Sequence, residues 1–179
     1  MQNELVFFGD RHANQLPEPS EIEKKLRIDR NSAFSPFSKF VGNDRAVRKM
    51  QTAAYTALGR ENHMMREMAF SVFGPSSAGK TTLVRLYAEC VQLPFIEISP
   101  KSLKTTDDLF KIVRKTLSEN GLELFEISPK KFSLPPCVIF IDEVHALSSG
   151  VVDGLLKATE YDDSMLVTES GVVCDTYNV

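Results

Sequence analysis

Apolar and polar positions recur along most of the chain with the periods of helices and strands. Val47, Met50, Ala54 and Leu58 are spaced by three or four residues, which predicts a helix after the segment FVGND. Short apolar runs predict strands over 68–73 and 94–99, and the run in PPCVIFIDEVH predicts a third. The same reading predicts helices around 83–91, 109–117 and 152–156 and a hairpin over 165–174.

The order of these elements indicates the fold class. Strand, loop, helix and strand follow one another over 68–99, which is a βαβ unit. The unbroken apolar run before Asp142 is typical of a strand buried on both faces of a parallel sheet. Thr105 and Asp108 have capping-box spacing before the helix that Gly121 would end. We therefore expect an α/β protein in which helices flank a parallel sheet.

The first 38 residues differ from the rest. Three of the nine prolines and many polar residues lie there, and Ser20 with Glu23 predicts one short helix. We interpret residues 1–38 as an extension or linker and residues 39–179 as one globular domain. A chain of 179 residues, 42% hydrophobic, has room for one such core.

The charge and the cysteine content of the chain exclude several classes of function and of site. The net charge of −3 gives no overall basic field for nucleic acid, so any DNA contact would be local or lie outside this chain. Cys90, Cys137 and Cys174 are widely spaced within apolar sequence, which favours buried thiols over disulfides or zinc ligands. No segment has the length of apolar sequence that a membrane span needs. We expect a cytoplasmic protein with no membrane partner.

A glycine-rich segment interrupts the apolar pattern between the first strand and its helix. Four residues separate Gly74 from Gly79, and Lys80 and Thr81 follow, which is the spacing of a phosphate-binding loop for ATP. Small residues let backbone N–H groups approach the phosphates, and the lysine reaches the β and γ phosphates. The alternative interpretation is a glycine-rich turn that lies beside a surface lysine and has no function in binding. The predicted nucleotide-binding residues in this segment are Gly74, Pro75, Ser76, Ser77, Ala78, Gly79, Lys80, Thr81 and Thr82.

Two carboxylates follow the third predicted strand. Asp142 stands where parallel sheets place ligand sites and is suited, with the Thr81 hydroxyl, to hold Mg²⁺. Glu143 could polarise the attacking water as the catalytic base. The alternative is that the pair simply caps the next helix. His145 could transmit the state of the bound nucleotide to a neighbouring segment, or it could have no functional role.

The segments GPSSAGKTTL, FIDEVHAL and FVGND together resemble the AAA+ ATPases, and among them the RuvB branch-migration motors, over residues 36–179. SPKSLKTTDDLFKIV and the hairpin at 165–174 are also similar to that group. The resemblance implies a P-loop ATPase with ATP and Mg²⁺ as cofactors, a homo-oligomeric ring in the full-length protein, and DNA as a possible partner. It also implies that Val41 and Gly42 lie against the adenine, although a helix-start position is a fair competing interpretation of these two residues.

The resemblance also carries departures. Residues 1–35 have no clear counterpart, and LELFEISPKKFSLPP is longer than the usual connection. In the family a strand after the hairpin lies between the phosphate-loop strand and the Asp142 strand. Because the sequence stops at Val179, we expect a truncated domain in which that central position is empty or is taken by GVVCDTYNV. Sensor residues, arginine finger and lid would also be missing, so we expect these 179 residues alone to be a poor ATPase.

Three functions follow from these patterns. The first is a RuvB-like AAA+ motor that couples ATP hydrolysis to movement of DNA, by branch migration or helicase-type remodelling. The second is a DExH-type helicase, suggested by Asp142-Glu143-Val144-His145. The third is a nucleotide-responsive regulatory or binding module that changes conformation without turnover.

Overall fold

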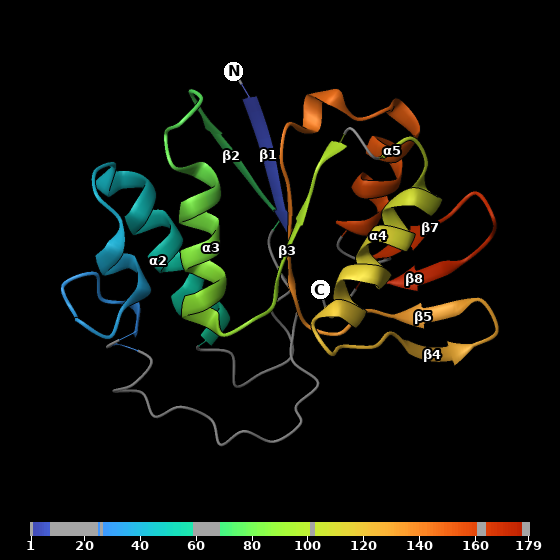
Figure 1. Ribbon diagram of the computed structural model, residues 1–179, viewed down its shortest axis with the longest axis horizontal. Helices are drawn as coiled ribbons and strands as arrows, with labels where there is room; N and C mark the ends of the chain where they lie inside the picture. Colours follow the sequence, from blue (N-terminus) through green and yellow to red (C-terminus); the bar gives the residue numbers. More distant parts are fainter. Residues whose placement is uncertain are drawn as a thin grey trace.

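The chain forms a central sheet with helices on both faces and a second, smaller sheet beside it (Figure 1). The computed structural model describes residues 2–7, 25, 27–58, 69–100, 103–160 and 164–176. The short helix predicted from Ser20 lies outside the described residues. The structure is an α/β fold of the P-loop type, as the sequence predicted.

The central sheet has four described strands in the order β2-β1-β6-β3. The strands β3 and β6 are parallel, whereas β1 runs antiparallel to both β2 and β6. It follows that β2, β6 and β3 all point the same way and end at the same edge of the sheet. The bounds are β1 (Gln2–Phe7), β2 (Phe70–Gly74), β3 (Phe95–Ile98) and β6 (Val138–Ile141).

The central position of this sheet is filled, and both expectations for it are wrong. Leu5 of β1 pairs with Ser71 of β2 on one side and with Ile141 of β6 on the other. The other candidate, GVVCDTYNV, instead contributes β8 (Val173–Asp175) to the second sheet. The facing backbone N–H and C=O groups of β2 and β6 need hydrogen-bond partners, and β1, which is remote in sequence, supplies them.

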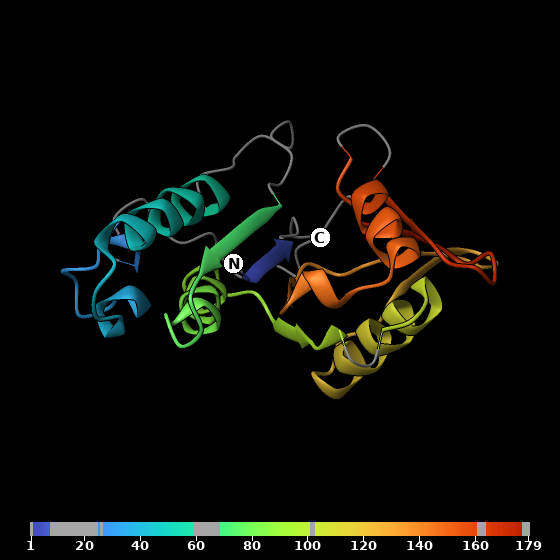
Figure 2. The ribbon, with the colours of Figure 1, turned by 90° about the horizontal axis from the view of Figure 1, so that it is seen from above.

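Helices cover both faces of the central sheet (Figure 2). On one face lie α2 (Asp44–Leu58) and α3 (Lys80–Val91), and on the other lie α4 (Thr106–Glu119) and α5 (Ser149–Ala158). Alternate residues of β6 serve the two cores: Val138 and Phe140 pack with α2 and α3, and Ile139 and Ile141 pack in the other core. The prediction of a strand buried on both faces is confirmed.

The second sheet has the order β4-β5-β8-β7 among the described strands. The predicted hairpin is confirmed as the antiparallel pair of β7 (Met165–Val167) and β8. The long connection LELFEISPKKFSLPP holds a second antiparallel pair, β4 (Phe125–Ser128) and β5 (Lys131–Ser133), which the sequence reading did not predict. The inner side of this sheet adds Leu166 and Cys174 to the core under α4 and α5.

Part of the expected extension packs into the domain. The single-turn helix η1 (Pro36–Lys39) brings Phe37 into the core beside α3, where the ring is fully buried. The division of the chain at residues 38 and 39 stays a prediction.

Two local predictions are confirmed. Thr105 and Asp108 form a reciprocal capping box at the start of α4. Cys90, Cys137 and Cys174 are buried and form no disulfide, and burial raises the pKa of the Cys90 thiol to about 12. In the described part of the chain no helix is long and apolar enough to cross a bilayer.

Candidate functional site

The glycine-rich segment has the strand-loop-helix context that its spacing predicted. Strand β2 ends at Gly74, and α3 begins at Lys80. Ser77 and Gly79 have φ of +63° and +80°, so the loop curls on itself and its residues 75–78 remain exposed. Successive N–H groups in such a curve, followed by a helix N-terminus, form a concave anion site.

Lys80 lies folded within this loop. Its Nζ donates hydrogen bonds to the carbonyl oxygens of Pro75, 3.1 Å away, and Gly74, 3.3 Å away. The side chain is 8% exposed, and its Cδ lies 3.7 Å from the position that a Cβ on Gly74 would occupy. Thr81 is half-buried in the first turn of α3, and Thr82 is exposed. A Cβ on Gly74 would therefore be in ordinary van der Waals contact with the lysine stem.

Asp142 and Glu143 directly follow β6, as the sequence indicated. The backbone N–H of Asp142 donates to the carbonyl of Ile98, 3.2 Å away, so pairing with β3 continues up to the carboxylate. Glu143 has a left-handed backbone, φ 50° and ψ 49°, and its side chain makes no capping hydrogen bond to the short helix that follows. The capping alternative therefore does not describe Glu143. A non-glycine residue held in this region costs on the order of 1 kcal/mol or more, and such residues cluster at functional sites.

The loop and the two carboxylates lie at the same edge of the central sheet, with β1 between them. The pairings through Leu5 place Ser71 of β2 level with Ile141 of β6. Since Gly74 is three residues beyond Ser71, the loop starts about 10 Å further along than Ile141, on a strand about 10 Å to the side. His145 is exposed in η3 (Val144–Ala146).

The donor set at this edge suits Mg²⁺ held together with a polyphosphate. Asp142 and Thr81 are the two protein oxygens that the sequence predicted. Among the described residues no three His, Cys, Asp or Glu side chains gather into a metal cluster. Mg²⁺ keeps several waters and commonly takes only one or two protein ligands beside phosphate oxygens, so a sparse set fits it.

The segment before α2 contacts the loop through a residue that the sequence reading did not select. The Phe40 ring lies 3.0 Å from the position of a Cβ on Gly79, whereas Val41 is 92% exposed and Gly42 has nothing within 4 Å of its Cβ position. The role of Val41 and Gly42 at the adenine stays a prediction. The signal for Phe40 was its place directly before Val-Gly, where an aromatic side chain can cover a glycine.

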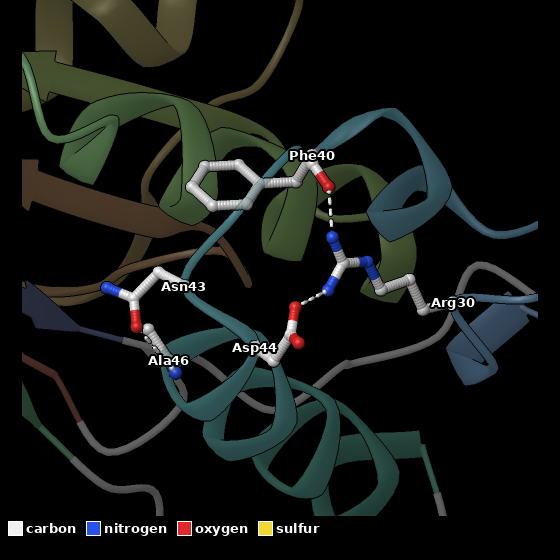
Figure 3. A network of polar contacts seen from close by, with 5 residues as sticks. All are labelled: Arg30, Phe40, Asn43, Asp44 and Ala46. Atoms are coloured by element: carbon white, nitrogen blue, oxygen red, sulfur yellow. Dashed lines mark hydrogen bonds and ion pairs between the residues drawn. The ribbon is translucent and has the colours of Figure 1, made fainter.

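Arg30 and Asp44 also belong to this region and had no signal in the sequence. The Arg30 guanidinium donates to the Phe40 carbonyl and to the Asp44 carboxylate, and Asn43 caps α2 through the Ala46 N–H (Figure 3). Arg30 is fourteen residues from Asp44, so local periodicity could not pair them.

A phosphate loop after one strand of a mixed sheet, with an acidic pair at the end of another strand that points the same way, defines a P-loop nucleotide-binding protein. The particular family follows from comparison with known sequences. Residues 70–171 match the ATPase family associated with various cellular activities (AAA), and the chain belongs to that family.

Relatives in this family are about one quarter identical to this chain in sequence. The chain is 26% identical over 160 residues to the Holliday junction branch migration complex subunit RuvB of Fusobacterium nucleatum, covering 88% of this chain and 40% of that protein. The RuvB subunit of Chloroflexus aurantiacus is 24% identical over 148 residues, covering 83% of this chain and 37% of the relative. The chain thus spans about two fifths of these relatives. No solved structure matches it. The resemblance to AAA+ ATPases of the RuvB type is confirmed.

Proposed function

We propose that this AAA domain binds ATP with Mg²⁺ and hydrolyses it as part of a motor that acts on DNA. The observation that carries the proposal is the placement of the phosphate loop and the Asp142-Glu143 pair at one edge of the same sheet. Binding and hydrolysis need different groups, and this edge offers both.

Each residue has a chemical role in this proposal. The N–H groups of residues 76–79 and of the first turn of α3 would surround the phosphates, and Lys80 would exchange its carbonyl partners for β and γ phosphate oxygens. Asp142 and Thr81 would hold the metal, which neutralises charge on the phosphates when it is bound. Glu143 would accept a proton from the attacking water.

Nucleotide binding is tested by calorimetric titration of the chain with ATP, ADP and AMP, with and without Mg²⁺. We expect ATP and ADP to bind and AMP to bind far more weakly, because the loop would contact the β and γ phosphates and AMP has neither. Equal affinity for ATP and AMP would contradict a phosphate-loop site. Phosphate release, measured on a longer protein that contains this chain, tests hydrolysis separately.

Action on DNA rests on the relatives, whose name assigns them to a Holliday junction branch migration complex. We propose that the protein containing this chain assembles as a homo-oligomeric ring and couples ATP turnover to movement of branched or duplex DNA. A four-way DNA junction should then raise ATP turnover more than a linear duplex of the same length does. An ATP turnover that neither DNA changes would favour a nucleotide-responsive module instead.

Family membership favours the AAA motor over the DExH-type helicase. We also propose a cytoplasmic location, which three buried cysteines that form no disulfide support, because disulfides are rare in reducing compartments.

A further inference from the structure

Arg30 ties together the two ends of the segment between η1 and α2 (Figure 3). One terminal nitrogen donates to the carbonyl oxygen of Phe40 at 2.6 Å, and the other donates to the Asp44 carboxylate at 2.5 Å. The Arg30 side chain is 28% exposed. A planar guanidinium holds two acceptors at a fixed separation, and a flexible ammonium does so less well.

The segment that Arg30 holds, residues 40–44, packs against the phosphate loop through the ring of Phe40. Phe40, whose carbonyl Arg30 holds, is 8% exposed, and its ring atoms Cε2 and Cζ lie 3.0 and 3.1 Å from the Cβ position of Gly79. Phe40 is therefore held at its backbone carbonyl by Arg30, and its ring packs against the last glycine of the loop. A shift of this backbone would move the ring across Gly79.

Between the two clamped residues the chain presents an open apolar position. Val41 is 92% exposed, and Gly42, with φ of +85°, has no atom within 4 Å of its Cβ position. An exposed valine beside a glycine leaves an uncovered apolar position directly after Phe40, the residue whose ring packs against Gly79 of the phosphate loop. The aromatic base of a nucleotide whose phosphates occupy that loop needs such a surface, because burying it removes apolar area from water.

We propose that Arg30 is a positioning residue for the base-bearing part of the nucleotide. It holds the Phe40–Gly42 segment in place by joining the Phe40 carbonyl to Asp44, and it does not touch the phosphates. This inference rests on the proposed nucleotide binding. It predicts that loss of Arg30 weakens ATP binding and leaves the binding of a polyphosphate without a base unchanged.

The test compares two ligands and two matched variants. Arg30→Met removes both hydrogen bonds and keeps the length of the side chain, whereas Arg114→Met makes the same change at an exposed position of α4. Calorimetry with Mg²⁺ is carried out with ATP and with inorganic tripolyphosphate. We expect Arg30→Met to bind ATP about tenfold more weakly, as expected for the loss of a hydrogen bond from a charged group. Tripolyphosphate should bind within about twofold of the parent, and Arg114→Met should match the parent for both ligands.

A second readout follows the base itself. The triphosphate of 2-aminopurine riboside has a fluorescent base, and its emission at saturation should differ between the parent and Arg30→Met while Arg114→Met matches the parent. Arg30→Lys should lie between them because one ammonium cannot hold both acceptors in the same geometry. In the double variant with Asp44→Asn, the losses should not add, since both residues act through one bridge.

The outcomes separate this inference from the function on which it rests. Failure of the parent to bind ATP removes the proposed function and the role of Arg30 together. An unchanged ATP affinity in Arg30→Met with a binding parent overturns the role of Arg30 alone. Equal losses for ATP and tripolyphosphate, or unchanged emission at saturation, also overturn it, because Arg30 would then act on the loop or the fold. Thermal unfolding of each variant identifies a folding defect, in which case Arg30→Lys decides the comparison.

Discussion

The ammonium group of Lys80 lies 3.1 Å from the carbonyl oxygen of Pro75, so the cation of the phosphate loop is held by the backbone of that loop. A lysine that is 8% exposed needs such partners, since burial disfavours an uncompensated charge. Phosphate oxygens would offer the same nitrogen stronger, charged acceptors. The contact with Pro75 therefore keeps the lysine within the loop, where a bound polyphosphate can take it over.

Replacing Lys80 with methionine should weaken ATP binding by at least about tenfold, because one charge-assisted contact to phosphate is lost. Calorimetry with Mg²⁺ and ATP measures this. Lys115→Met is the matched control, since Lys115 lies on α4 and forms an exposed ion pair with Glu119. An affinity equal to that of the parent in Lys80→Met would rule out this loop as the phosphate site.

Substitution of Glu143 should lower ATP turnover, whereas substitution of Asp142 should lower Mg²⁺-dependent binding. Glu143→Gln keeps the size of the side chain and removes the base, so ATP binding should persist while turnover falls about 10²-fold to 10⁴-fold. Asp142→Ala should mainly weaken the Mg²⁺-dependent part of binding. Binding and phosphate release are measured on the same preparations of a protein that hydrolyses ATP. Normal turnover in Glu143→Gln would remove the catalytic assignment.

The parts of the site that the sequence predicted are those with a local signature. Gly79, Lys80 and Asp142 belong to short segments whose spacing and flanking strands are visible along the chain. The capping box of Thr105 and Asp108 is local in the same sense. Chemistry that depends on neighbours in sequence can be inferred without knowing which strands pair.

The parts that were missed depend on contacts between distant residues. Arg30 meets Asp44 across fourteen residues, and β1 meets β6 across more than a hundred. No periodicity in residues 2–7 indicates which strands they join. The pair β4 and β5 did carry a signal, since Phe125 and Ile127 alternate with polar residues, but both side chains are more than half exposed and suggest no core.

Asp107 should make the attachment of the β7–β8 hairpin depend on pH. Its carboxylate accepts hydrogen bonds from the hydroxyl and the N–H of Ser170, and the hydroxyl contact is the main reason that the pKa of Asp107 lies below its ordinary value of 3.8. Because the pKa is lowered in the folded state, the stabilisation is present above pH 3.8 and is lost as the pH falls through the lowered pKa.

The Ser170 amide resonance should follow this titration with a midpoint below 3.8. Asp107→Asn should abolish that titration and leave the rest of the spectrum near neutral pH largely unchanged. A midpoint at or above 3.8 would show that the hydrogen bonds do not favour the carboxylate.

Gly154 should be the sensitive glycine of α5. A Cβ there would lie 2.6 Å from Cγ2 of the buried Thr106, so Gly154→Ala should lower the free energy of unfolding by about 1 to 3 kcal/mol, as overpacking does. Gly150→Ala in the same helix meets no atom within 4 Å and should be neutral or slightly stabilising. Denaturant unfolding compares them. Adding Thr106→Ser removes the clashing methyl and should restore part of the loss; equal stability of the two alanine variants would contradict this packing.

Residues 2–7 should be required for the integrity of the central sheet. The strand β1 pairs with β2 through Leu5 and Ser71 and with β6 through Leu5 and Ile141, so its removal leaves unpaired backbone groups on both β2 and β6. A chain that lacks residues 2–7 should unfold at a lower temperature and associate more readily, as scattering and calorimetry can detect. Glu4→Pro is a milder test, because proline removes a backbone donor opposite Val72 and is poorly tolerated between two paired strands. The same substitution at Glu123, exposed before β4 and outside the central sheet, is the matched control. If Glu4→Pro and Glu123→Pro unfold at the same temperature as the parent, β1 does not hold β2 and β6 together.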